Sequence, residues 1–213
     1  EFKTPVATIQ GFVNLLKLDS ITAEQRKEYL DIISIETERL IQLSGNVLLL
    51  SNLDNTERKP EKTVFSLDEQ LRLTVLQFET QLEKKHLNVS INVDTISVMG
   101  YEEILKQAWI NLLSNAIKFT PTGGAIEIAA TSSNGFATVV ISDTGIGMTP
   151  NVREHLFDRF YQGDASRATQ GNGLGLSLVK RILDLCNGKI KVSSTEGEGS
   201  VFEVSIPLDI RYL

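Results

Sequence analysis

The sequence has few of the features on which disulfide-rich, membrane-spanning or nucleic-acid-binding proteins depend. Its 213 residues include one cysteine, Cys186, which excludes an internal disulfide and fits a reducing compartment. No stretch approaches the roughly 18 consecutive apolar residues of a membrane span, and no signal peptide is visible. The formal net charge of −6 argues against a nucleic-acid partner. We therefore expect this region to be cytoplasmic and to make no contact with a membrane.

Three short segments carry an informative pattern of polar and glycine residues. In chain order they are NLLSNAIKFT at residues 111–120, DTGIG at 143–147 and GNGLGL at 171–176. The first offers two amides and a lysine, the second a carboxylate before a glycine turn, and the third a glycine-rich entry into a helix. Each is weak alone, but together they predict a nucleotide-binding site.

The first segment predicts a cluster of ligands on one face of a helix. Asn111, Asn115 and Lys118 are spaced by four and three residues, so their side chains can converge. A neutral amide oxygen suits magnesium when bound phosphates already supply the negative charge. Lys118 would then meet phosphate as a point charge. Taken in isolation, the segment fits an ordinary helix with exposed polar residues better.

The second segment places a carboxylate at the end of a strand. Residues 137–142 form the predicted strand, and we expect its apolar side chains to be buried on both faces of a sheet. Asp143 follows the strand. A carboxylate only accepts hydrogen bonds, so it can accept one from the amino group of adenine but repels the carbonyl oxygen of guanine. The alternative is a solvated turn.

The third segment precedes an apolar helix predicted at residues 174–185. Unpaired backbone N–H groups and the dipole of this helix favour phosphate, and the glycines permit a close approach. The segment lacks the lysine and the serine or threonine of a Walker loop. It also does not follow a strand, as the dinucleotide-binding motif requires. Neither of these two common phosphate loops is therefore present.

Taken together, the three segments resemble the ATP-binding domain of sensor histidine kinases, in the superfamily shared with gyrase, mismatch-repair ATPases and the large heat-shock chaperone. LFDRFYQGD at residues 156–164 is similar to the phenylalanine box that histidine kinases carry between the two glycine boxes. Asn172 stands where the family often has threonine, a departure that leaves the glycines intact. The resemblance covers essentially the whole chain.

The resemblance implies roles for individual residues and implies ATP and Mg²⁺ as cofactors. Asn115 is expected to bind magnesium, Asp143 to bind the adenine amino group and Arg159 to help position the terminal phosphate. The remaining expected nucleotide-binding residues are Asn111, Lys118, Phe119, Gly145, Gly147, Gly171, Gly173, Leu174 and Gly175.

The first residues resemble the other half of such a kinase. EFKTP at residues 1–5 is similar to the sequence that directly follows the phosphoacceptor histidine in the family. The resemblance implies that Glu1 is the general base toward that histidine and that Thr4 orients a water when the partner response regulator is dephosphorylated. Alternatively, Thr4 caps a turn before Pro5. The chain's own histidines, His86 and His155, match no acceptor position.

Residues 1–54 predict a helical hairpin. The first helix carries apolar residues at alternating steps of four and three, which form a heptad seam at Phe2, Val6, Ile9, Val13 and Leu16. Thr22 and Gln25 form a possible capping box for a second helix. Its apolar face continues through Ile33, Leu40, Leu43, Val47 and Leu50. Two such helices have too little core to be stable alone, so we expect a homodimer with a four-helix bundle.

A polar, proline-containing linker at residues 55–65 separates the hairpin from an ATP-binding domain at 66–213. Ser66 and Glu69 suggest a second capping box that opens a helix reaching about Lys85. A further helix is predicted at 101–119, and strands at 89–93, 126–131, 137–142, 189–194 and 201–206. The predicted fold class is α+β, in which the hairpin precedes an α/β sandwich with a mixed sheet backed by helices. Trp109 and Phe78 are expected in the core.

The segment 158–172 is polar and poor in aliphatic residues. We expect it to be a mobile lid over the nucleotide that becomes ordered on binding. Phe157 and Phe160 are then expected to dock on the hairpin differently in different states.

The function that best fits these expectations is the transmitter region of a two-component histidine kinase. The γ-phosphate of ATP would pass to a histidine on the hairpin and then to an aspartate in the receiver domain of a response regulator. Membrane spans of the parent protein, if it has them, would lie upstream. Two alternatives stay open: an ATP-binding signalling module without kinase activity, and an ATP hydrolase of the same superfamily. The hydrolase is disfavoured because Ile110 stands where a catalytic glutamate would be needed.

Overall fold

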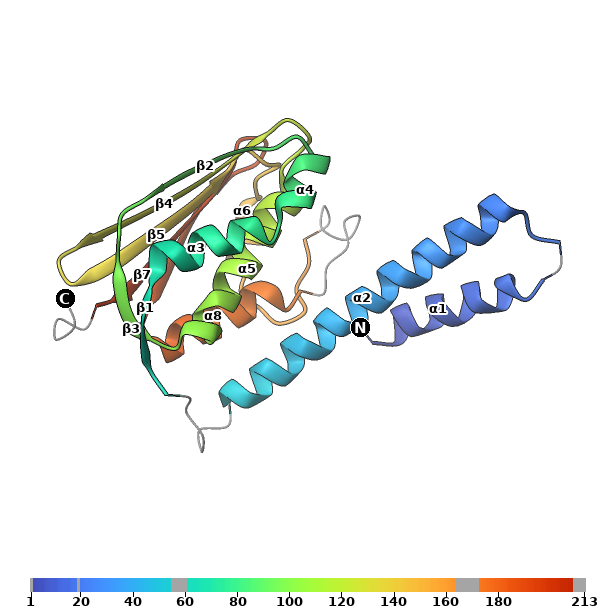
Figure 1. Cartoon of the computed structure of the whole chain (residues 1–213), viewed down its shortest axis with the longest axis horizontal. Coiled ribbons are helices and arrows are strands. Elements are labelled where there is room, and N and C mark those ends of the chain that lie inside the picture. Colours follow the sequence, from blue (N-terminus) through green and yellow to red (C-terminus); the bar gives the residue numbers. More distant parts are fainter. Residues whose placement is uncertain (1, 19, 55–60, 164–172, 209–213) are drawn as a thin grey trace.

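The computed structural model describes residues 2–18, 20–54, 61–163 and 173–208. They form a long helical hairpin and an α/β unit, which meet along the C-terminal part of the hairpin's second helix (Figure 1). This arrangement confirms the predicted α+β class, with the hairpin first and the sheet-containing unit second.

The hairpin consists of α1 (Lys3–Leu16) and α2 (Ala23–Asp54). The two helices run antiparallel, and the rings of Phe12 and Tyr29 lie 5.2 Å apart between them. The capping box predicted at the start of α2 is formed. The Thr22 N–H donates to Gln25 Oε1 at 2.9 Å, and the Gln25 N–H donates to Thr22 Oγ1 at 3.1 Å. Two N–H groups that the helix leaves unpaired are thereby satisfied.

The apolar residues of the hairpin are buried to different degrees. On α2, Leu43 and Leu50 belong to the same core cluster as the α/β unit. On α1, the predicted seam residues Phe2, Val6 and Val13 stay 46%, 41% and 38% exposed. Within one chain, therefore, the hairpin leaves much of its apolar surface uncovered.

The α/β unit is built on a five-stranded sheet in the order β2-β4-β5-β7-β6. Its strands are β2 (Asn88–Val93), β4 (Ala125–Ser133), β5 (Phe136–Asp143), β6 (Lys189–Thr195) and β7 (Gly199–Pro207). The β2–β4 pair is parallel and the other pairs are antiparallel, so the sheet is mixed as predicted. The short strands β1 (Thr63–Ser66) and β3 (Ser97–Gly100) form a separate antiparallel pair.

Helices cover one side of the sheet (Figure 1). These are α3 (Leu67–Leu76), α5 (Glu102–Phe119) and α8 (Gly175–Leu185), with the short helices α4 (Glu79–Lys84) and α6 (Pro150–Glu154) beside them. The expectation that the strand before Asp143 is buried on both faces is wrong. Val139 and Ile141 are buried at 1% and 2% exposure, whereas Val140 on the opposite face is only half-buried. The sheet therefore has one covered face, as in a two-layer sandwich.

Several predicted boundaries differ in the structure. The helix expected from Ser66 to Lys85 is divided into α3 and α4. Ser66 ends β1 and occupies the N-cap position of α3, but it makes no side-chain cap, and its hydroxyl donates to Asp68 Oδ1 at 2.6 Å. Of the expected linker, residues 55–60 lie outside the described residues and 63–65 are part of β1.

Trp109 is fully buried at the centre of the core, as predicted. Its indole N–H donates to Gln70 Oε1 at 2.7 Å, and the Gln70 amide donates to the Glu102 carbonyl at 2.9 Å. Phe78 is partly buried against the same core. In the described part of the chain, no helix has both the length and the apolar character that crossing a bilayer requires.

Candidate functional site

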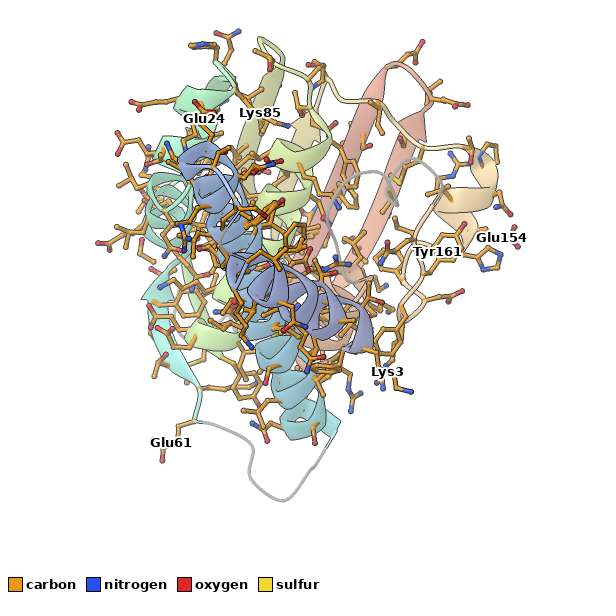
Figure 2. All side chains as sticks on the ribbon, turned by 90° about the vertical axis from the view of Figure 1, so that its right-hand side faces the viewer. Lys3, Glu24, Glu61, Lys85, Glu154 and Tyr161 are labelled. Atoms are coloured by element: carbon orange, nitrogen blue, oxygen red, sulfur yellow. The ribbon has the colours of Figure 1, made fainter. Side chains whose placement is uncertain are left out.

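A cavity of about 960 Å³ opens between the α/β unit and the hairpin. Its walls come from α2, α5, the loop after β5, residues 156–163 and the start of α8. Seen from the right-hand side of Figure 1, the hairpin crosses in front of the α/β unit (Figure 2). Residues from all three predicted nucleotide motifs line this cavity.

Helix α5 contributes the first motif. Asn111, Asn115, Lys118 and Phe119 all line the cavity, as their spacing on one helical face predicts. The Asn111 amide nitrogen donates to the Gln107 carbonyl at 2.7 Å, which fixes the orientation of the side chain. Its oxygen is then directed toward the start of α8.

Lys85 holds the C-terminal end of α5. Its ammonium donates to the carbonyls of Ile117, Lys118 and Thr120 at 2.7, 2.9 and 2.9 Å. These carbonyls lie at the negative end of the helix, where a cation is favourable. Lys85 therefore fixes the turn that carries Lys118 and Phe119, although it does not line the cavity itself.

The Lys118 ammonium lies 4.6 Å from the centroid of the Phe119 ring. Burial lowers the pKa of Lys118 to about 8, and the positive charge of Arg39 on the hairpin adds to this decrease. Both effects disfavour the charged ammonium when the cavity holds no anion. An anion in the cavity would oppose both effects, because it favours the charged ammonium.

Asp143 lies at the end of β5 and lines the cavity. Burial raises the pKa of its carboxyl group, and the hydrogen bond from the Gly145 N–H to Oδ1, at 2.8 Å, opposes that increase. The following loop is tied to its neighbours. The Ile146 N–H donates to the Phe119 carbonyl at 3.2 Å, and the Gly197 N–H donates to the Ile146 carbonyl at 2.8 Å.

Two glycines permit close approaches around the cavity. Gly147 has φ +64°, and a β-carbon there would collide with the Thr195 carbonyl oxygen. A β-carbon on Gly175 would lie 2.7 Å from Asn111 Oδ1, so this glycine lets the start of α8 approach α5. Gly173 also lines the cavity. Buried Gly145 and the helix-capping Leu174 do not line it, and Gly171 lies outside the described residues.

The phenylalanine box contributes Leu156 and Tyr161 to the cavity wall. Arg159 is exposed and is not among the lining residues. The Phe160 N–H donates to the Gly173 carbonyl at 2.9 Å, which joins the end of this box to the last glycine motif. Residues 164–172 of the expected lid lie outside the described residues.

Thr4, His86 and His155 are not among the residues that line the cavity. Glu1 lies outside the described residues, and Thr4 is exposed in the first turn of α1, where its carbonyl accepts the Thr8 hydroxyl at 3.0 Å. His155 Nδ1 lies 2.9 Å from Asp158 Oδ2, and His86 is exposed in a turn with φ 50°.

Sequence reasoning missed one wall of the cavity. Helix α2 lines it with Ile35, Glu38, Arg39, Gln42 and Asn46. Apart from the adjacent pair Glu38 and Arg39, these residues recur at steps of three or four, which places them along one helical face. The sequence signal that could have revealed this wall is the row of mostly polar residues along one face of α2, a helix that carries many aliphatic residues at its other positions.

Two protein families match this sequence. Residues 100–210 match the family described as histidine kinase-, DNA gyrase B- and HSP90-like ATPase, which covers the described parts of α5, the loop after β5 and α8. Residues 1–56 match the His Kinase A phospho-acceptor domain. The chain belongs to the histidine kinase family. The order of the two matched domains is that of a transmitter region.

Individual histidine kinases resemble the chain along nearly its full length. It is 31% identical to the sensor-like histidine kinase SenX3 of Mycolicibacterium smegmatis over 97% of this chain and 55% of that protein. The solved structure of histidine kinase ThkA with response regulator protein TrrA is similar, with a TM-score of 0.78, 28% identity and coverage of 97% of this chain and 58% of that chain. Full-length ShkA in complex with AMPPNP is also similar, with a TM-score of 0.74, 26% identity and coverage of 97% and 44%. The chain spans about half the length of the curated relatives it matches.

Proposed function

We propose that this histidine kinase region binds ATP and transfers its γ-phosphate to a histidine on the hairpin, and from there to an aspartate of a response regulator. The observation that carries the proposal is the convergence of the three motifs on one cavity. Asn115, Asp143 and Gly175 come from parts of the chain that only the fold brings together. The cavity of about 960 Å³ is also large enough for a nucleotide.

Asp143 is the proposed adenine-binding residue. Its carboxylate accepts a hydrogen bond from the exocyclic amino group of adenine and repels the carbonyl oxygen of guanine. The hydrogen bond from the Gly145 N–H supports the charged form that this role requires. The other residues that we propose to bind the nucleotide near the base are Phe119, Gly145, Gly147 and Leu174.

Asn115 is the residue that would hold Mg²⁺. Among the described residues no group of three or more His, Cys, Asp or Glu side chains is placed to bind a metal. The available donor is thus a neutral amide, which fits a magnesium ion whose other ligands are phosphate oxygens and water. Bound there, magnesium would neutralise charge on the phosphates.

The phosphate tail is proposed to lie between α5 and the start of α8. Lys118 supplies a positive charge, while Gly173 and Gly175 supply backbone N–H groups at the N-terminus of α8. Gly171, which lies outside the described residues, is proposed to bind phosphate as part of the same motif. Asn111 contributes a polar group from the same wall. We also propose that Arg159 positions the terminal phosphate, which requires it to turn toward the cavity from its exposed position.

The proposed acceptor is a histidine that directly precedes Glu1 in the longer protein. Glu1 would take the proton from the ring while the other ring nitrogen forms a bond to the γ-phosphorus. The bond between the γ-phosphorus and its bridging oxygen breaks, and ADP leaves. When the region acts as a phosphatase, Thr4 would orient the water that dephosphorylates the response regulator.

We further propose that the region is a homodimer with a response-regulator receiver domain as its partner. The exposed apolar residues of the hairpin support dimerisation, since a second hairpin would cover them. The histidine kinase ThkA, which is similar to this chain, was solved in complex with the response regulator protein TrrA, and this supports the choice of partner. The single cysteine, Cys186, favours a cytoplasmic location, and the net charge of −6 argues against contact with nucleic acid.

The test is incubation of the chain, extended by its natural upstream residues, with γ-labelled ATP and Mg²⁺. We expect acid-labile label on the protein, followed by its transfer to a receiver domain. The matched variant Asp143→Asn removes the charge that recognises adenine and should lose most of the label. Nucleotide binding without any labelling would instead support the non-enzymatic signalling module, and equal labelling of Asp143→Asn would refute the adenine assignment.

A further inference from the structure

Helix α2 of the hairpin forms one wall of the nucleotide cavity. Its lining residues Glu38, Arg39, Gln42 and Asn46 face the α5 residues Asn115 and Lys118 across the cavity. Most of this wall is polar. A wall that served only to pack the hairpin against the ATP-binding unit would be expected to be apolar. The cavity therefore belongs to both the hairpin and the ATP-binding unit.

Arg39 is the cationic residue of this wall. Its charge acts on the Lys118 ammonium, so two positive charges from different parts of the chain share the cavity. The Glu36 carboxylate lies 3.7 Å from the Arg39 guanidinium, and the Arg39 side chain is 26% exposed. Two like charges in a partly buried cavity repel one another unless an anion lies between them.

Arg39 also lies at the level of the phosphoacceptor end of the hairpin. Phe12 faces Tyr29, and the two helices run antiparallel. Phe2 lies ten residues before Phe12, and Arg39 lies ten residues after Tyr29, so Phe2 and Arg39 are at the same level along the hairpin. Figure 1 agrees, since the N-terminal end lies beside the middle of α2. Arg39 thus lines the cavity at the level of the start of α1.

We propose that Arg39 is a nucleotide-binding residue contributed by the hairpin, which binds the phosphate tail of ATP together with Lys118. A guanidinium presents its N–H groups in a planar fork that matches phosphate oxygens. This inference rests on the proposed function, because it takes ATP as the ligand of the cavity. It adds a binding residue from outside the ATP-binding unit.

The consequence is that bound ATP holds the two parts of the chain together. Phosphates between Arg39 and Lys118 replace a repulsion by two attractions, whereas adenosine, which has no phosphate, cannot do so. The hairpin should therefore contribute to the affinity for ATP and not to the affinity for adenosine.

The test measures the affinities of the whole chain for MgATP and for adenosine by calorimetry, in the wild type and in Arg39→Gln. We expect Arg39→Gln to weaken MgATP binding by about tenfold or more and to leave adenosine binding unchanged. Arg39→Lys, which keeps the charge, should recover part of the loss. Arg26→Gln is the matched control, because it removes the same charge from an exposed position on the same helix.

Three outcomes would overturn the inference. They are unchanged MgATP affinity in Arg39→Gln, an equal loss for adenosine and MgATP, or an equal loss in Arg26→Gln. If the wild-type chain bound no MgATP at all, the proposed function itself would fail, and this result is distinct from a wild type that binds ATP without help from Arg39.

Discussion

The hairpin and the ATP-binding unit are stabilised in different ways. In the ATP-binding unit, α5, α8 and the covered face of the sheet share one core in which residues such as Trp109, Leu112 and Leu178 are fully buried. Among the described residues of the hairpin, only Pro5, Leu43 and Leu50 are buried. The unit therefore supplies its own core, whereas the hairpin depends on surfaces outside itself.

The uncovered surface of the hairpin is substantial. Its exposed large apolar residues are Phe2, Val6, Val13, Leu15, Leu18, Leu30, Ile35, Ile41, Val47 and Leu48. Large apolar side chains exposed in such number along two helices indicate surfaces that a partner would cover. Substitutions in the two parts should consequently have different effects, and three experiments follow from that difference.

The largest effect is expected from Trp109→Ala in the ATP-binding unit. It should lower the free energy of unfolding by about 3–5 kcal/mol, because it opens a cavity in the core and leaves Gln70 without its indole donor. Urea denaturation followed by circular dichroism measures the change. Trp109→Phe, which fills most of the space, should cost less. An unchanged urea midpoint for Trp109→Ala would contradict the assignment of this residue to the core.

A smaller effect is expected from Ile41→Ser and Leu48→Ser in the hairpin. These residues are 67% and 63% exposed in one chain, so the unfolding of the ATP-binding unit should hardly change. Dimerisation should weaken by about 1.5–3 kcal/mol for each side chain, as judged by sedimentation equilibrium. Lys27→Ser, at an exposed polar position on the same helix, is the control. Equal dissociation constants for all three variants would show that this face is not the dimer interface.

The smallest effect concerns Lys118, where the two parts meet. With a pKa of about 8, Lys118 is mostly charged at pH 7 and mostly neutral at pH 9. Affinity for ATP should therefore fall by about tenfold, or about 1.4 kcal/mol, as the pH rises between these values. Binding calorimetry at several pH values measures the change. Lys118→Met should bind weakly with little pH dependence, and a wild type that binds ATP equally well at both pH values would refute the role of this charge.

Local sequence patterns predicted those parts of the fold that depend on neighbouring residues. The capping box of Thr22 and Gln25 involves residues three positions apart and is formed. The positions of Asn111, Asn115 and Lys118 on one face of α5 follow from helical periodicity alone. The strands of the main sheet were also predicted, with apolar alternation as the signal at residues 89–93 and an apolar run as the signal at 137–142.

Features that depend on distant residues were not predicted. The β1–β3 pair joins short strands more than 30 residues apart, and neither strand has a pattern of its own. Lys85 and the carbonyls it binds are separated by 32 to 35 residues. Val140 is only half-buried because no helix among the described residues covers that face of the sheet (Figure 1), which an apolar run cannot reveal. The α2 wall of the cavity likewise depends on how the two parts dock.

The contact between α2 and α8 has a mechanical consequence. Leu43 and Leu50 lie in the shared core, and the Arg181 guanidinium donates to the Leu53 carbonyl at 3.1 Å. Helix α8 begins at the last glycine motif, so the end of the hairpin and one edge of the nucleotide cavity belong to one packed body. An axial shift of α2 must either carry α8 with it or break this packing. Force applied along the hairpin therefore reaches the cavity through side chains, without passing through residues 55–60.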